Sequence, residues 1–564
     1  MAAVAILSQE TRIMISRIRR WLPRFSYPVA ATLAASVLVG CGGSGSGGSG
    51  SAPPPPQTVF YLDCSAPTNG SGTQTSPWNT LAGANNYAFQ PGDQLLINRG
   101  ATCSGTLQPS GSGSSGSPIT IDTYGTGAQP VINGGANSSA LLLDNQQYWE
   151  INNLEIVGGT QFGVSIYAYV DNVNLDHIYL RNLNVHGASW VSSARGDSAE
   201  VSISSTGLHA VISDILVDGV TAHDTQASEG IVIYAGGGTT NADRSDQDLG
   251  NNITVQNSTA HDVGGDGILV MTASNVLMQN NVTYHTGLCS ACTGSTPGAL
   301  WEWFCHTCTV QNNESYANST WGQGYDGGDF DIDYYNTNNI VQYNYGHDTA
   351  GYCVSVFGAE NTVDSNNVIR YNVCSNNTQL ANSPDPGEIL LNTWDGGSID
   401  GLQIYNNTIY WNPVTPGTAI NTTWADVTNN SPDLIENNII YGAAPGMIAT
   451  DSPFTLSNNI YWMTGAGSPS WQYNGTTYTD FASYQSGSGQ DANSLYTDPL
   501  LNNPTYHSTG MPTAAFTLQA NSPAIGAGTN VCNGQSSCSM GTQDFFGNPL
   551  PNGSGYNIGV YQGP

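Results

Sequence analysis

Lysine is absent from this chain of 564 residues, and charged residues of all kinds make up only 9% of it. Ten arginines stand against 41 acidic residues, so the formal net charge is −31 at pH 7. A surface of this sign repels nucleic acid and polyanionic sugars unless cations intervene. We therefore expect no nucleic-acid partner, and few side chains are available to neutralise an anionic substrate.

Half of the arginines lie within the first 24 residues, before an apolar stretch from about Pro28 to Gly40. A basic region, an apolar core and a site of small residues are typical of an export signal. A single membrane span is the alternative, but about a dozen apolar residues is short for one. The sequence "LVGC" at 38–41 resembles the bacterial lipobox. This resemblance implies cleavage before Cys41 and acylation of its sulfur.

The segment after Cys41 predicts a tether. Residues 42–57 are rich in glycine, serine and proline, which is typical of a flexible linker that becomes stiffer. Gly42 resembles the residue at this position in lipoproteins of the outer membrane. We therefore expect an exported lipoprotein at the outer membrane or cell surface. Removal of residues 1–41 leaves five arginines against 40 acidic residues, a formal charge of −35.

Ten cysteines remain once Cys41 is assigned to lipid, and an even number fits disulfide pairing in an oxidising compartment. Proximity in sequence suggests three pairs, namely Cys64 with Cys103, Cys353 with Cys374, and Cys532 with Cys538. The other four form two C-x2-C pairs, Cys289 with Cys292 and Cys305 with Cys308. In the cytosol this spacing would indicate a zinc ribbon. After export we expect two disulfides that hold a loop beside Trp301 and Trp303.

A short phrase of alternating apolar and polar residues returns every 21 to 38 residues from about residue 150. Alternation with period two predicts strands, and no stretch of this region has a helical period. Short strands that cannot bury a face alone must stack on their neighbours around a shared core. The positions taken as equivalent are Asn153, Asn182, Gly219, Asn257, Asn281, Asn313, Asn344, Asn372, Asn407, Asn438 and Asn459.

This repeat predicts an all-β fold, a right-handed parallel β-helix that forms a single elongated domain. Asparagines recurring at a bend would donate their amides to the next coil and form a ladder. A propeller or sandwich would instead show a regular period of about 40–50 residues or turn-rich hairpins. We expect an N-terminal cap and first coils over 58–150, the helix core over 151–465, and C-terminal coils with a closing segment over 466–564.

Three segments resemble secreted bacterial proteins of the pectin-lyase-like superfamily. They are "PWNTLAGANNYAFQPGDQLLINRGATCSGTL" at 77–107, "GGDFDIDYYNTNNIVQYNYGHDTAGY" at 327–352, and the stretch from "SPAIGAG" to "NIGVYQ" at 522–562. The resemblance covers nearly all of residues 58–564 and implies a parallel β-helix of the carbohydrate-active type. It specifies the chemistry weakly, because one fold hosts many activities.

The segment "DGGDFDIDYY" at 326–335 contains the main candidate site, Asp329, Asp331 and Asp333. Phe330 and Ile332 should point into the core, because burying three carboxylates would cost far more than burying two hydrophobic side chains. The three aspartates would then face outward together. Alternate residues of a strand lie about 6.5–7 Å apart, between the carboxyl separations of retaining and inverting glycosidases. Ordinary surface decoration and a Ca²⁺ site are the alternatives.

Neighbouring repeats offer further acids and flat aromatic surfaces. Asp266 and Glu302 would extend the acidic wall, although the strand around Glu302 leaves open whether Glu302 or the tryptophans face inward. The predicted sugar-binding aromatics are Trp301, Trp303, Tyr335 and Trp394.

Several histidines follow the recurrent position by three or four residues, at the same place in the repeat. Structural ladders explain them better than metal sites or general bases. His347 is the exception that we assign to catalysis, because it lies one strand after the acidic triplet.

Three functions fit these features. The first is a glycoside hydrolase that acts on a neutral or weakly charged glycan through paired aspartates and requires no cofactor. The second is a polysaccharide lyase, with or without the assistance of Ca²⁺. A lyase needs cationic groups to stabilise an enolate. The third is a glycan-binding or adhesive surface protein without catalysis. The resemblance implies Lys or Arg in lyases of this fold, so the missing lysine favours hydrolysis. We expect a polysaccharide substrate and a monomer.

Overall fold

The structure is a computed structural model. It describes residues 57–189, 198–225, 229–241, 244–289, 297–320, 326–384, 386–428, 430–451, 453–533, 538–551 and 555–563. The predicted signal, the lipidation site Cys41 and Cys292 lie outside these residues, so the predictions made for them stay predictions.

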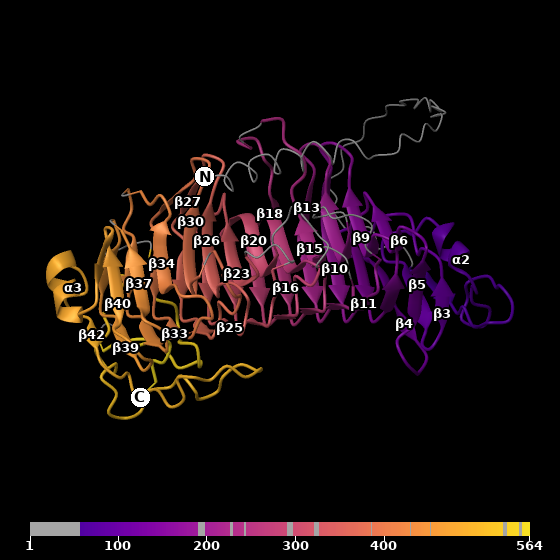
Figure 1. Ribbon diagram of the computed structural model, residues 1–564. Coiled ribbons are helices and arrows are strands. Elements are labelled where there is room, and N and C mark those ends of the chain that lie inside the picture. Colours follow the sequence, from indigo (N-terminus) through magenta and orange to yellow (C-terminus); the bar gives the residue numbers. More distant parts are fainter. Residues whose placement is uncertain are drawn as a thin grey trace, which may run out of the picture. The chain divides into compact units, whose positions relative to one another are not determined.

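The unit Gln57–Pro564 is a parallel β-helix, as predicted. Its strands lie side by side along one axis in Figure 1. Each coil contributes up to three strands in the order A, B and C, and the equivalent strands of successive coils pair in parallel. β18 spans the corner between A and B, so these two stacks form one 26-stranded sheet, whereas stack C is a separate 14-stranded sheet.

The bounds of the strands are as follows. Stack A contains β6 (Ser139–Asp144), β9 (Phe162–Ala168), β12 (Ala199–Ser205), β15 (Glu229–Tyr234), the first half of β18 (Asp266–Gln279), β20 (Gly298–His306), β23 (Gly328–Asp333), β26 (Val354–Gly358), β30 (Ile389–Thr393), β34 (Thr418–Trp424), β37 (Gly446–Thr450) and β40 (Ser470–Tyr473). Stack B contains β1 (Val59–Leu62), β2 (Gln94–Asn98), β4 (Ile119–Tyr124), β7 (Trp149–Asn152), β10 (Asn174–Arg181), β13 (Val211–Asp218), β16 (Gly250–Gln256), the second half of β18, β21 (Thr309–Gln311), β24 (Ile340–Gln342), β28 (Val368–Arg370), β32 (Gln403–Tyr405), β35 (Leu434–Glu436) and β38 (Thr455–Ser457). Stack C contains β3 (Thr102–Ser104), β5 (Val131–Gly135), β8 (Glu155–Gly158), β11 (Asn184–His186), β14 (Thr221–His223), β17 (Thr259–His261), β19 (Val282–Tyr284), β22 (Glu314–Tyr316), β25 (Tyr345–His347), β29 (Val373–Ser375), β33 (Thr408–Trp411), β36 (Ile439–Gly442), β39 (Ile460–Met463) and β42 (Leu495–Tyr496). Outside the stacks, β27 (Val363–Ser365) pairs with β31 (Ser398–Asp400), and β41 (Thr476–Tyr478) pairs antiparallel with β40.

The core runs along the axis as columns of apolar side chains, one from each coil. One column of stack A consists of Val201, Ile231, Ile268, Leu300, Phe330, Val354, Ile389 and Ile420. All of these belong to a single buried cluster. Because each coil covers the apolar edge of the previous one, the alternating pattern of each short strand is sufficient to specify its inward face.

The predicted asparagine ladder is present. Asn372 is fully buried, its Nδ2 donates to the Val341 carbonyl at 2.9 Å, and its Oδ1 accepts from the Asn344 backbone N–H at 3.0 Å. The same pattern joins Asn281, Asn313, Asn344, Asn372, Asn407, Asn438 and Asn459.

The predicted register of the first four repeats is wrong by one residue. Asn153, Asn182, Gly219 and Asn257 stand one position earlier, at a bend where φ is between 52° and 67°. Such a left-handed bend favours asparagine and glycine. The true counterparts of the ladder there are Leu154, Leu183, Val220 and Ser258.

Two short helices lie at opposite ends of the stacked strands, α2 (Leu81–Asn85) and α3 (Phe481–Ser488) (Figure 1). The Asp480 carboxylate caps α3 by accepting from the Ser483 backbone N–H at 2.8 Å, and Gly489 ends the helix at φ 71°. Among the described residues, neither helix has the length and apolar character needed to span a membrane.

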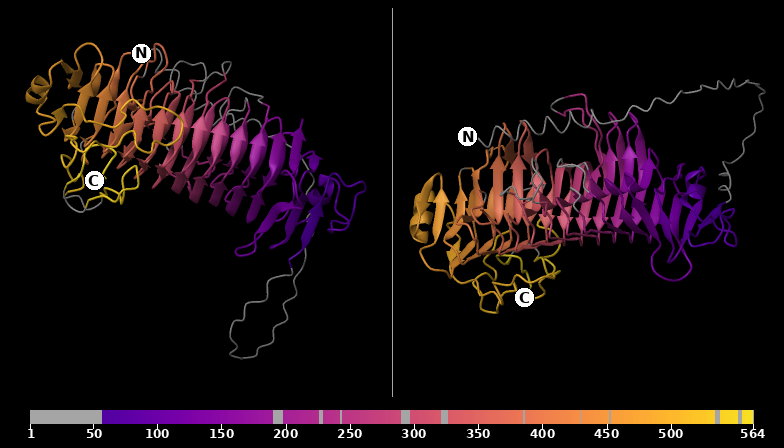
Figure 2. Two further views of the ribbon diagram at one scale, coloured as in Figure 1. Left: turned by 90° about the horizontal axis from the view of Figure 1, so that it is seen from below. Right: turned by 45° about the vertical axis from the view of Figure 1, so that its right-hand side comes forward.

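After β42 the chain does not add another coil but returns along the outside of the stacked strands, as Figure 2 shows. A second buried cluster forms there, in which Phe516 and Val531 pack with Tyr371 and Tyr405. The Tyr345 hydroxyl donates to the Ser508 carbonyl at 3.2 Å. This closing segment therefore covers part of the B and C stacks.

Candidate functional site

The strand β23 places Phe330 and Ile332 in the core, with exposed fractions of 1% and 0%, as predicted. Asp331 stands between Trp301 of β20 and Ser355 of β26, and Asp333 stands between Trp303 and Phe357. Asp331 and Asp333 thus project from the outer face of stack A at alternate positions of one strand, on either side of the inward Ile332.

The prediction that Asp329 shares this face is wrong. Its Oδ1 accepts from Ser315 Oγ at 2.8 Å, Thr349 Oγ1 at 2.7 Å and Asn318 Nδ2 at 3.0 Å, all at the buried side of stack C. A Cβ atom on Gly346 would lie 2.5 Å from Asp329 Oδ2, so this glycine makes room for the carboxyl group. Burial raises the pKa of Asp329 to about 8.

The reason is a corner in the coil, where two consecutive residues point inward. Cys353 and Ala419, which occupy the position of Asp329 in later coils, belong to the core cluster together with their successors Val354 and Ile420. The alternation between faces begins only after this corner.

The outward carboxylates gather around a buried phenol. Asp331 accepts from Ser355 Oγ at 2.5 Å and from the Tyr352 hydroxyl at 3.4 Å. Burial raises the pKa of Tyr352 well above its ordinary value, and the negative charges of Asp326, Asp331 and Asp333 raise it further. We call Asp326, Asp331 and Asp333 the acidic cluster.

Asp326 is a member that the sequence reasoning did not assign. It lies on the loop before β23, is half-buried, and adopts a φ of 55°. The signal was its position at the start of the same acidic segment, followed by Gly327 and Gly328. Only the folded structure shows that this loop brings Asp326 close to Tyr352, where Asp331 and Asp333 also lie.

The open question about Glu302 is settled by the register of β20. Glu302 stands in line with Val270 and Ile332, inside the core, and is fully buried. Burial raises its pKa to about 8, and the charges of Asp331 and Asp364 add to this rise. Its predicted catalytic role therefore lacks access to a substrate on the outer face.

Trp301 and Trp303 point outward, but both are largely covered. Trp301 Nε1 donates to Asp266 Oδ1 at 3.1 Å, and the backbone N–H of Gly298 donates to the same oxygen at 2.8 Å. Asp266 is thus a fully buried partner of Trp301, beside the outer face.

Arg244 covers one of the predicted aromatic platforms. Its guanidinium carbon lies 4.4 Å from the Trp303 ring centroid and 5.9 Å from that of Tyr335. Tyr335 is 8% exposed and donates its hydroxyl proton to Glu360 Oε2 at 2.9 Å. These rings have little free surface for a sugar. Trp394 remains half-buried, with its ring 5.9 Å from that of Tyr334.

His347 lies on β25 of stack C, away from the outer face of stack A that carries the acidic cluster. It is 1% exposed, with Nδ1 2.8 Å from Asp348 and Nε2 3.3 Å from Glu314. Burial acts to lower its pKa, but these two acidic partners raise it above the ordinary value. The structure therefore does not bring His347 together with Asp331 and Asp333.

His347 instead ends a ladder of rings, as expected for the other histidines. Successive centroids lie 4.7 to 5.0 Å apart along the outer side of stack C. The members are His186, His223, His261, Tyr284, Tyr316 and His347.

Disulfides confirm the three predicted pairs, Cys64–Cys103, Cys353–Cys374 and Cys532–Cys538. The C-x2-C residues Cys305 and Cys308 are bonded to each other, and Cys289 is also in a disulfide.

Two groups among the described residues hold three potential metal-ligand atoms within 4.8 Å of one another, Glu302 with Cys305 and Cys308, and Glu388 with Cys353 and Cys374. Both contain a disulfide, which does not supply the thiolates that metals bind. The trio suggested for Ca²⁺ does not fit as one site, because Asp329 faces inward and Asp331 outward.

Comparisons with known proteins address the fold. No protein-family model matches the sequence, and no curated protein matches it significantly. A structure of the GH136 lacto-N-biosidase from Eubacterium ramulus is similar, with 19% identity, a TM-score of 0.50, and coverage of 72% of this chain and 67% of that one. XylC in complex with xylose shows 10% identity, a TM-score of 0.46 and coverage of 90% and 98%. Pectate lyase Pel9A shows 14% identity, a TM-score of 0.36, and coverage of 90% of this chain and 96% of that one. The first of these similarities supports the parallel β-helix fold.

Proposed function

We propose that this protein is a carbohydrate-active enzyme, a glycoside hydrolase for a neutral or weakly charged glycan. The observation that carries the proposal is the acidic cluster, in which Asp331 and Asp333 stand on one outer strand face beside Tyr352. Paired carboxyl groups are the usual machinery of glycoside hydrolysis.

The two strand aspartates differ in their surroundings, which suggests a division of roles. Asp331 is 7% exposed and accepts from two hydroxyl groups, Ser355 and Tyr352. These two hydroxyl groups hold the Asp331 carboxyl group in one orientation, so we assign Asp331 as the nucleophile or base. Asp333 is half-buried on the side of Trp303 and is assigned as the proton donor to the glycosidic oxygen.

The charge of the chain supports a neutral substrate. Four arginines, Arg99, Arg181, Arg244 and Arg370, fall within the described residues, and the sequence has no lysine. Three of them lie elsewhere, since Arg181 pairs with Glu150, Arg370 contacts the closing segment and Arg99 belongs to an early coil. A polymer of uronates would find little compensating charge at this face.

One observation favours a lyase as the second candidate. Arg244 is distant from the cluster in sequence but stacks on Trp303, the strand neighbour of Asp333. In a lyase this guanidinium would neutralise a uronate carboxylate while a base removes the adjacent proton. A surface protein that binds glycans without turnover is the third outcome that the experiment below separates.

The test uses Asp331→Asn and Asp333→Asn in the soluble body from residue 58, incubated with a panel of neutral and acidic polysaccharides. We expect each variant to lower the release of new reducing ends by at least about 100-fold, the usual contribution of a general acid or base. Asp224→Asn is the matched control, because its side chain is 67% exposed beside His223 on stack C. Unchanged rates in both cluster variants would refute this site.

The product identifies the reaction class. A hydrolase yields reducing ends without ultraviolet absorbance, whereas a lyase also forms an absorbing double bond. Loss of activity in chelator would indicate a Ca²⁺-assisted lyase, and retention of activity is expected for the hydrolase. Retention of the protein on a glycan column with no product from any polysaccharide would support the binding protein instead.

A further inference from the structure

The outer face of stack A continues beyond the acidic cluster toward the C-terminal coils. Asp331 is followed in register by Ser355, Leu390 and Asn421 on the next three strands. Three strand spacings correspond to about 14 Å along the axis. A ligand that starts at Asp331 and follows the axis for about 14 Å therefore reaches Asn421.

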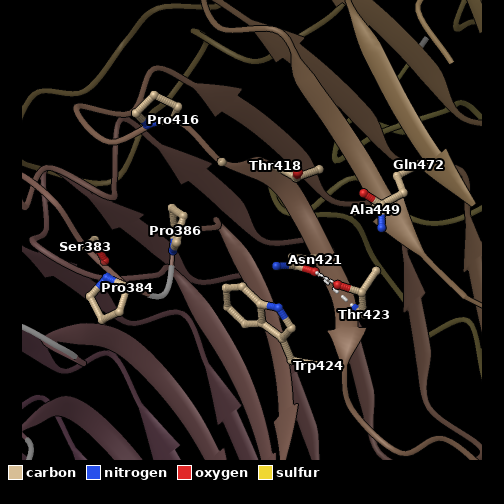
Figure 3. Close-up of a pocket in the computed structure, with 11 residues that line it drawn as sticks. Ser383, Pro384, Pro386, Pro416, Thr418, Asn421, Thr423, Trp424, Ala449 and Gln472 are labelled. Atoms are coloured by element: carbon tan, nitrogen blue, oxygen red, sulfur yellow. Dashed lines mark hydrogen bonds between the residues drawn. The ribbon is translucent and has the colours of Figure 1, made fainter. Parts of the chain in front are cut away.

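A pocket of about 460 Å³ opens at this place. Figure 3 shows Pro384, Pro386 and Pro416 on one side, Ala449 and Gln472 on the other, and Asn421 and Trp424 between them. We call it the Trp424 pocket. The prolines come from the loops that lead from stack C to stack A, the same kind of loop that carries Asp326.

The chemistry of the lining is that of a sugar site. Trp424 is 40% exposed, and it offers a flat apolar face beside proline rings. The described lining residues carry hydroxyl and amide groups and no charged side chain, while Asp385 lies outside the described residues. A neutral glycan presents apolar ring faces and hydroxyl groups, so it fits this lining better than a uronate or a phosphate does.

One polar group in the pocket is already oriented. Asn421 Oδ1 accepts from the backbone N–H of Thr423 at 3.1 Å and from its hydroxyl at 2.9 Å. Held in this way, the amide nitrogen lies on the side of Pro386 and Trp424 (Figure 3). A fixed donor next to an exposed ring can contact a sugar hydroxyl with little loss of side-chain entropy.

A row of aromatic rings leads from Trp303, beside the acidic cluster, to Trp394, next to the strand β30 that pairs with the Trp424 strand β34. The Tyr334 ring lies 5.6 Å from Trp303 and 5.9 Å from Trp394, and Trp394 lies 5.8 Å from Phe357. Asn392, two residues before Trp394, is the register partner of Trp424. The half-buried Trp394 thus borders the stretch of face that a chain would cross between the two places.

We propose that the Trp424 pocket is a distal subsite that holds one part of a neutral polysaccharide while another part of the same chain lies at the acidic cluster. This inference rests on the proposed function and deepens it, because it specifies an extended neutral chain aligned with the axis of the β-helix. Short oligosaccharides that cannot reach both places gain nothing from the pocket.

The experiment compares Trp424→Ala with Trp462→Ala. Trp462 is a half-buried tryptophan on β39 of stack C, 5.5 Å from the Tyr496 ring, so its loss removes an indole away from the pocket. Both variants are made in active protein and in an Asp331→Asn, Asp333→Asn background that cannot turn over substrate. Circular dichroism and the unfolding midpoint establish that each variant is folded, and Trp424→Phe, which keeps a ring, gives a second folded variant.

Binding is measured by affinity electrophoresis of the inactive proteins in gels with xylan, glucomannan, mixed-linkage β-glucan or arabinan, and with polygalacturonate for comparison. We expect retardation by at least one neutral polysaccharide, at least fivefold weaker for Trp424→Ala and unchanged for Trp462→Ala, in line with about 1 kcal/mol for one stacked ring. Trp424→Phe should retain most of the affinity. Equal retardation of both alanine variants, retardation only by polygalacturonate, or no retardation by any of these polymers would overturn the inference.

Turnover separates this inference from the proposed function. In active protein, Trp424→Ala should raise KM for long chains and leave kcat/KM for the shortest cleaved oligosaccharide unchanged. If wild-type protein cleaves none of these polymers but the Trp424-dependent retardation is present, the proposed function fails and the subsite stands. If cleavage is present and Trp424→Ala alters neither binding nor KM, the subsite fails and the proposed function stands.

Discussion

Asp329 and Asp331 are two residues apart on one chain, yet their carboxyl groups lie in different surroundings. Asp329 is held in the interior by three donors, and burial raises its pKa to about 8, so it is mainly protonated at neutral pH. Asp331 lies on the outer face with Ser355 and Tyr352. Asp329 therefore has a structural role, and Asp331 is the carboxyl group on the outer face that we propose acts on a substrate.

This difference predicts opposite results for one substitution at two positions. Asp329→Asn replaces a protonated acid by a neutral amide of the same shape, so we expect kcat/KM at pH 7 to remain close to wild type. Asp331→Asn should abolish most of the activity. Initial rates on the best polysaccharide of the panel measure both effects. A loss for Asp329→Asn as large as that for Asp331→Asn, in a folded protein, would contradict the separation of the two carboxyl groups.

At the scale of the element, the buried asparagine ladder holds successive coils in register. Each member satisfies backbone groups of the adjacent coil at a bend where the strands have ended. Water cannot replace these partners inside the stack, so an unsatisfied group there is costly. Ladder positions thus combine a local conformational role with contacts between coils.

Asn372→Ala tests the ladder at its centre. It removes the bonds to the Val341 carbonyl, to the Asn344 backbone N–H and to Asn407, and we expect a loss of about 3 kcal/mol or more in the free energy of unfolding. Urea titration measures the loss. Asn493→Ala is the control, because Asn493 is exposed and donates only a 3.3 Å bond to Ser457 among the described contacts. Similar stability of the two variants would argue against the ladder as a major source of stability.

At the scale of the whole molecule, the interior contains several carboxylic acids. Burial raises the pKa of Asp329, Glu302 and Glu388 to about 8 in each case. In the unfolded chain these groups ionise near pH 4 (about 3.9 for Asp and 4.3 for Glu). Between these values the folded chain binds more protons than the unfolded chain, so stability decreases as pH rises.

We therefore expect the free energy of unfolding to fall between about pH 5 and pH 8, by up to about 1.4 kcal/mol per pH unit for each such group. Urea titrations at pH 5, 6.5 and 8 measure the slope. Glu302→Gln and Glu388→Gln should each flatten it, because an amide has no proton to lose. Glu360→Gln serves as the control on the half-buried Glu360, which accepts from Tyr335. A slope that neither interior variant changes would show that other groups control the pH dependence.

The sequence alone was sufficient for the stacked parallel strands, the inward Phe330 and Ile332, the asparagine ladder and three disulfides. These features depend on short-range patterns, namely alternation within a strand and recurrence between coils. The tertiary structure decided the rest. The corner before β23 turns Asp329 inward, the pairing of β20 with β18 and β23 places Glu302 in the core, and a distant loop brings Arg244 onto Trp303. Alternation specifies side-chain faces only while the chain is straight, and loops of variable length obey no period, so only the folded chain determines which residues meet on the outer face.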